Sequence, residues 1–168
     1  MEKKYKLTEE TINVFNKTLY RIEALRDFND VKKGDKGGFI EKENNLSQSG
    51  NCWVYGNAKV RDNAKVYGIA WVCDNARVRD NAKVCGDARI CGDAKVESNG
   101  DYIVFKNWWS SGRYFTWTKS NDMWKVGCFY GTGKQLIDKA YRDSEISGRE
   151  YERIVKYVKT INNDLEIM

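Results

Sequence analysis

Histidine is absent from the 168 residues of this sequence. No hydrophobic run is long enough to cross a bilayer, and the first ten residues are too highly charged for a signal peptide. A basic tail is missing as well, because the net charge of +5 is spread evenly along the chain. These absences argue against a membrane protein, a secreted protein and a nucleic-acid binder that relies on bulk charge. We therefore expect a cytoplasmic protein.

Cysteine is present, but in no spacing that is typical of a metal site. The five cysteines are Cys52, Cys73, Cys85, Cys91 and Cys128, with no CxxC pair among them. Disulfides are rare in cytosolic proteins, so we expect free thiols. The sequence has no histidine to complete a metal site, and no cluster of carboxylates lies beside the cysteines. The sequence therefore predicts no metal and no cofactor.

A six-residue repeat occupies the stretch from Val54 to Glu97. Large aliphatic residues hold one phase of it: Val54, Val60, Val66, Val72, Val78, Val84, Ile90 and Val96. Small residues hold another phase: Ala58, Ala64, Ala70, Ala76, Ala82, Ala88 and Ala94. This period is typical of a parallel β-helix, in which the aliphatic residue fills the interior and alanine fits a tight corner. Asn, Asp and Gly at the intervening positions tolerate the backbone of a sharp turn.

The repeat resembles the hexapeptide-repeat family, in which a small residue follows an aliphatic one by four positions. That resemblance implies a left-handed β-helix with three hexads per turn, and usually a homotrimer. The run from Tyr20 to Val60 is similar to hexapeptide-repeat proteins of bacteriophage genomes, most of them without an assigned activity, and so is the tail with its DYIVFKN and GCFYGT segments. Enzymes of the wider family are acyltransferases or carbonic anhydrases that use histidine. This sequence has none, so we expect no catalytic residue and no enzymatic activity.

Three segments follow from these patterns. Residues 1–50 are expected to form an N-terminal strand, over 19–25, and a glycine-rich capping loop, and residues 51–97 the β-helix. Residues 98–168 are expected to form a small α+β appendage. It would contain a three-stranded antiparallel meander over 102–105, 113–118 and 123–130, then two helices. Capping boxes at Thr132 with Gln135 and at Ser147 with Glu150 predict where the helices begin. The predicted fold class is mainly β.

Three hexads per turn would stack residues eighteen apart, about 4.8 Å from one another, on three outer faces. The first face is mostly apolar and carries Trp53, Tyr55, Trp71, Cys73, Arg89 and Cys91. Another subunit or the flanks of the chain should cover it, which makes Trp53, Tyr55, Trp71, Cys73 and Cys91 candidates for an oligomer interface. The third face carries Lys65, Tyr67, Lys83 and Cys85.

The second face is cationic and carries Lys59, Arg61, Arg77, Arg79, Lys95 and Glu97. Like charges on neighbouring strands repel. The face could therefore bind an anion, be neutralised by the aspartates at the corners, or remain solvated surface. We take its five cations, Lys59, Arg61, Arg77, Arg79 and Lys95, as candidate binding residues.

Aromatic and basic residues are interleaved in the predicted meander: Trp108, Trp109, Arg113, Tyr114, Trp117, Lys119, Trp124 and Lys125. Such a cluster can stack on a nucleotide or single strand, or it can belong to a core or an interface. We expect Trp117 and Trp124 in the core. For Trp108, Trp109 and Arg113 both interpretations stay open. The candidate ligand-binding residues of this segment are Trp108, Trp109, Arg113, Tyr114 and Lys119.

The leading functional hypothesis is a non-enzymatic phage accessory protein. As a counter-defence inhibitor it would bind the nucleic-acid-binding surface of a host immune effector, or sequester an anionic nucleotide signal. A trimeric assembly module of the virion is one alternative. A hexapeptide-type acyltransferase is another, although the acidic residues are scattered and no base is apparent.

Overall fold

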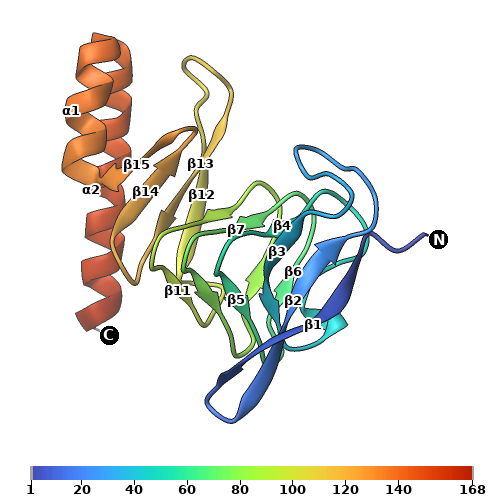
Figure 1. Cartoon of the computed structure of the whole chain (residues 1–168). Coiled ribbons are helices and arrows are strands. Elements are labelled where there is room, and N and C mark those ends of the chain that lie inside the picture. Colours follow the sequence, from blue (N-terminus) through green and yellow to red (C-terminus); the bar gives the residue numbers. More distant parts are fainter. Residues whose placement is uncertain (1, 168) are drawn as a thin grey trace.

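The computed structural model describes residues 2–167, with side chains described as far as residue 164. It is a mainly β protein: a β-solenoid of about three turns, an antiparallel four-stranded sheet and two helices (Figure 1). This agrees with the predicted fold class. No helix in the described part is long and apolar enough to cross a membrane.

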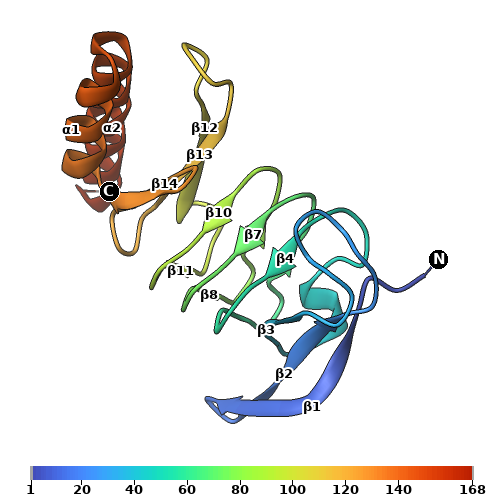
Figure 2. The same ribbon diagram turned by 45° about the horizontal axis from the view of Figure 1, so that its top comes forward.

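Eight two-residue strands form the solenoid. They are β4 (Trp53–Val54), β5 (Lys59–Val60), β6 (Lys65–Val66), β7 (Trp71–Val72), β8 (Arg77–Val78), β9 (Lys83–Val84), β10 (Arg89–Ile90) and β11 (Lys95–Val96). Parallel pairing joins β4 to β7 and β7 to β10, β5 to β8 and β8 to β11, and β6 to β9. Every partner lies eighteen residues away, as in Trp53 opposite Trp71. Figure 2 shows β4, β7 and β10 as successive rungs of one face, so three hexads make one turn.

The repeat explains why these strands are so short. Each aliphatic residue of the repeat and each alanine of the corner row is at most 1% exposed. The corners turn through residues with positive φ, such as Asp62 (60°), Asp74 (57°) and Gly92 (66°). Aspartate tolerates that backbone because its short carboxylate can hydrogen-bond locally, and glycine tolerates it because it has no side chain.

The solenoid begins out of phase with the rest. Ile40 pairs with Val60, and Leu46 bridges Val66, so these partners lie twenty residues apart rather than eighteen. Ile40 and Leu46 are buried, and their large side chains take interior positions at this end of the solenoid. Gly50, with a φ of 70°, lies in the longer connection that follows.

The N-terminal segment contains more strand than predicted. A hairpin of β1 (Tyr5–Val14) and β2 (Lys17–Ala24) pairs with β3 (Lys36–Ile40), and β3 runs parallel to β5. One sheet therefore has the order β1-β2-β3-β5-β8-β11 and joins the hairpin to the cationic face. A 3₁₀ turn, η1 (Glu43–Asn45), follows β3.

The C-terminal sheet has four strands instead of the three predicted. They are β12 (Tyr102–Lys106), β13 (Tyr114–Thr118), β14 (Met123–Val126) and β15 (Phe129–Thr132), paired in sequence order. The single strand expected over 123–130 is divided because the chain reverses at Gly127, whose φ is 55°. On β12, Tyr102 and Val104 pack against the solenoid core. Ile103 and Phe105 pack against a second core, which is formed by the C-terminal sheet and the helices that follow it.

Two helices cover the other side of this sheet: α1 (Gly133–Asp143) and α2 (Glu145–Ile167). The capping box of Thr132 and Gln135 is present as predicted. The capping box predicted at Ser147 is wrong, because α2 already begins at Glu145 and Ser147 lies inside its first turn. The hydroxyl of Ser144, just before the helix, accepts a hydrogen bond from the Ser147 amide at 3.1 Å. Trp117 and Trp124 are buried in the second core, as expected.

Candidate anion-binding groove

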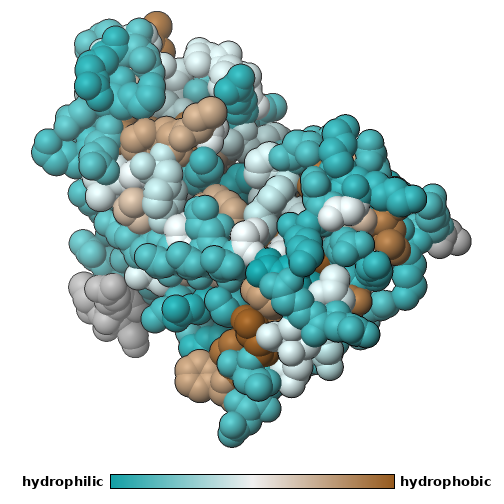
Figure 3. Space-filling model, in the orientation of Figure 1, coloured by the Kyte–Doolittle hydropathy of each residue, from teal (hydrophilic) through white to brown (hydrophobic). Residues whose placement is uncertain are grey.

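The cationic face forms one wall of a groove of about 490 Å³. The groove is lined by Val14, Phe15, Lys59, Arg61, Arg77, Val78, Arg79 and Lys95. The structure therefore brings together all five cations of the predicted face. The other wall is the tip of the β1–β2 hairpin, which the sequence did not reveal because β1 was not predicted. In Figure 3 the hairpin, at the bottom of the view, adds apolar surface beside the hydrophilic solenoid.

Two of the five cations are neutralised by acidic neighbours. The Arg61 guanidinium lies 2.6 Å from the carboxylate of Asp62, and Arg79 is paired with both Asp80 and Glu97. Desolvation acts to raise the pKa of Asp62, but hydrogen bonds, chiefly from Lys17, outweigh it and lower that pKa. Asp62 therefore remains a carboxylate and neutralises the charge of Arg61, while Asp80 and Glu97 do so for Arg79.

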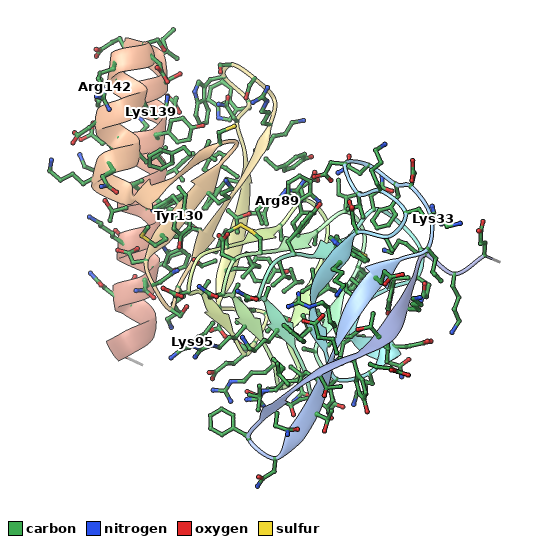
Figure 4. The ribbon with its side chains drawn as sticks, in the orientation of Figure 1. Lys33, Arg89, Lys95, Tyr130, Lys139 and Arg142 are labelled. Carbon is green, nitrogen blue, oxygen red and sulfur yellow. A yellow bond between two sulfur atoms is a disulfide. The ribbon has the colours of Figure 1, made fainter. Side chains whose placement is uncertain are left out.

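Three cations have no such partner. Lys59, Arg77 and Lys95 lie directly opposite one another on β5, β8 and β11. Within the described residues no carboxylate forms an ion pair with any of them; the ammonium of Lys59 donates only to the Asn57 carbonyl at 3.0 Å. Burial, and next the charge of Arg77, lower the pKa of Lys59. We call these three residues the cation ladder. Figure 4 labels Lys95, the rung nearest the C-terminal sheet.

The flanks of the same chain cover part of the apolar face. Trp53 is 1% exposed and packs edge to face on Phe28, with ring centroids 5.2 Å apart. The hydroxyl of Tyr55 donates to Asp30 at 2.9 Å, and the Arg89 guanidinium lies 4.1 Å from the ring centroid of Trp71. The flanks therefore cover Trp53, and a second subunit over the rest of this face stays a prediction. Trp53 has no surface left for a second subunit, while Tyr55 and Trp71 keep part of theirs.

Cys73 and Cys91 stack as their spacing predicts, with Cα atoms 4.7 Å apart, and their sulfurs form a disulfide. The expectation that all thiols are free is therefore wrong for this pair, because adjacent rungs bring the sulfurs into bonding range. The carboxylate of Asp74 lies within 4.8 Å of both sulfurs, and its Oδ2 accepts a hydrogen bond from the Gly92 amide. Cys52, Cys85 and Cys128 are free.

The candidate residues of the meander do not form one site. Trp109 packs on Tyr151 and belongs to the second core, whereas Trp108 is 72% exposed. Arg113 lines a separate hollow beside Cys128. Tyr114 is exposed next to Lys106. Lys119 lies closest to the groove, since it lines a shallow depression together with Lys95.

No family model matches the sequence. Over 60 residues the chain is 42% identical to YdcK of Escherichia coli strain K12, an uncharacterized acetyltransferase. The match spans 32% of this chain and 18% of YdcK. With the solenoid, it supports a hexapeptide-repeat β-helix. It also corrects the expectation that this protein is not an enzyme, because the relative is described as one.

Proposed function

We propose that the groove binds a ligand with several phosphoryl groups along the cation ladder. One observation carries this proposal: three cations are stacked at the strand spacing, and no acidic side chain of the described chain is paired with them. Like charges opposite one another on neighbouring strands are destabilising. A polyanion in the groove would supply the missing countercharge. With rungs about 4.8 Å apart, linked phosphoryl groups match the ladder better than a single charge does.

Calorimetry with inorganic tripolyphosphate tests the proposal. We expect binding that weakens as salt is added, because the contacts are ionic and exposed. Reversing two rungs, in Arg77→Glu with Lys95→Glu, should abolish it. Lys65→Glu with Lys83→Glu is the matched control: these lysines also lie on adjacent rungs, are exposed, and change the net charge equally. The absence of binding by the wild type, or an equal loss in both variants, would rule the site out.

Acyl transfer is a second candidate, favoured by the similarity to YdcK. An acyl-CoA donor carries phosphates that two rungs of the cation ladder, Arg77 and Lys95, could hold. Histidine is missing, so the candidate base in the groove is Lys59, whose pKa is lowered by burial. Wild-type protein should then release CoA thiol from acetyl-CoA in the presence of an acceptor amine, and Lys59→Met should not. Release equal to that without protein would remove this candidate.

The phage origin, the counter-defence role and the homotrimer stay predictions that rest on the resemblance of the sequence. A nucleotide signal would be one member of the ligand class proposed here. A host effector would have to be recovered from infected-cell lysate by the wild type and not by the ladder variant. Mass photometry of the purified protein would measure the number of subunits.

A further inference from the structure

Phe15 lies at the tip of the β1–β2 hairpin in a conformation that its side chain disfavours. Its φ is 49° and that of Asn16 is 63°, so both residues of the turn are left-handed. Two-residue turns of this kind favour Asn and Gly, because a bulky side chain is strained there. Phe15 is also 84% exposed, so it adds nothing to a core. Burial in a core therefore gives no reason for an aromatic residue at this position.

The location of Phe15 suggests one. Its ring lines the groove, and the Arg61 guanidinium lies 5.5 Å from the ring centroid. Arg61 is fixed by its ion pair with Asp62, and both side chains are less than 17% exposed. Lys17, at the start of β2, also reaches Asp62 and Glu41 and so ties the hairpin to the solenoid. The aromatic ring is therefore anchored beside the cation ladder.

We infer that the ligand is a nucleotide whose base stacks on Phe15 while its phosphates lie on the cation ladder. This deepens the function proposed above and rests on it. Aromatic side chains bind bases of every kind through their π-faces, and the nearby guanidinium adds a cation–π contribution. The groove thus combines an aromatic platform from the hairpin with countercharges from β5, β8 and β11. A nucleoside triphosphate and CoA both contain these two parts.

Calorimetry with ATP, UTP, CoA and inorganic tripolyphosphate separates the platform from the ladder. We expect the wild type to bind ATP and UTP about tenfold more tightly than tripolyphosphate, since one stacked base accounts for such a factor. Phe15→Asn removes the ring and suits the left-handed turn, so this variant should be at least as stable as the wild type. It should lose the tenfold advantage and keep its affinity for tripolyphosphate. Tighter binding of CoA than of ATP would identify CoA, a carrier of acyl groups, as the nucleotide that the groove binds.

Two controls make the outcome decisive. Tyr67→Asn removes an exposed aromatic residue from the third face and should leave every affinity unchanged. Phe15→Tyr keeps a ring and should keep the advantage of ATP. Equal affinity of the wild type for ATP and tripolyphosphate, or a Phe15→Asn variant that weakens both alike, would overturn the stacking inference while the proposed phosphate site stands. Failure of all ligands to bind would instead refute the proposed function.

Discussion

Arg77→Glu is expected to make the free protein more stable while it removes the phosphate site. Arg77 is the middle rung of the cation ladder, opposite Lys59 on one side and Lys95 on the other. The substitution turns two repulsive pairs into two attractive ones. A residue that stabilised the fold would show the opposite effect.

The magnitude follows from the number of pairs. A like-charged pair on neighbouring strands costs roughly 0.2–1 kcal/mol and an opposite pair gains a similar amount. Arg77 and Lys95 are exposed, which favours the lower part of this range. Two converted pairs should therefore raise the free energy of unfolding by about 1–2 kcal/mol. For a chain of this length that is a rise of roughly 2–8 °C in Tm.

Urea unfolding at two salt concentrations measures the effect. Between about 0.01 M and about 1 M salt the Debye length falls from roughly 30 Å to 3 Å. Screening should stabilise the wild type and shrink its difference from Arg77→Glu. Lys83→Glu is the internal standard, because it converts the single Lys65–Lys83 pair and should yield about half the gain. A less stable Arg77→Glu protein, or a difference that salt leaves unchanged, would refute repulsion within the ladder.

Three further predictions concern the rest of the chain. Reduction of the Cys73–Cys91 disulfide should lower the free energy of unfolding by about 3 kcal/mol, because the bond joins residues eighteen apart in the unfolded chain; urea curves with and without reductant test this. Burial raises the pKa of Tyr102 to about 12. The stability that the neutral Tyr102 hydroxyl contributes is therefore complete below pH 10 and is lost as the pH rises towards 12. Tyr102→Phe should reduce the fall in the free energy of unfolding over this pH range. Tyr157→Phe, at an exposed site, should not. Trp124→Ala should cost about 3–5 kcal/mol, and hydrogen exchange should show the C-terminal sheet and helices opening while the solenoid stays protected.

The period of six made the solenoid predictable from the sequence. The interior of the coil is so narrow that each inward position accepts one size of side chain, as Val60 and Ala58 show. A local pattern therefore fixes contacts between residues eighteen apart. The cation ladder follows from the same phase, since Lys59, Arg77 and Lys95 differ by one turn each.

The hairpin wall of the groove could not be predicted in the same way. The sequence of β1, YKLTEETINV, has too few apolar residues to indicate a strand. It is held instead by pairing with β2 and by Lys4, which is fully buried and donates to the Cys52 carbonyl at 2.9 Å. A buried lysine is contrary to the usual preference, and burial lowers its pKa. Without the hairpin, nothing in the sequence connects Phe15 with the cations of the solenoid.

The stacked turns also give the groove a length that can be counted. Each turn contacts only the turns above and below it, as in other repeat proteins. An in-frame duplication of residues 59–76 would add one turn and, on the cation ladder, one more rung. A coil of this type can thus change how many phosphates it accommodates by whole increments, whereas a site in an ordinary globular core would have to be rebuilt.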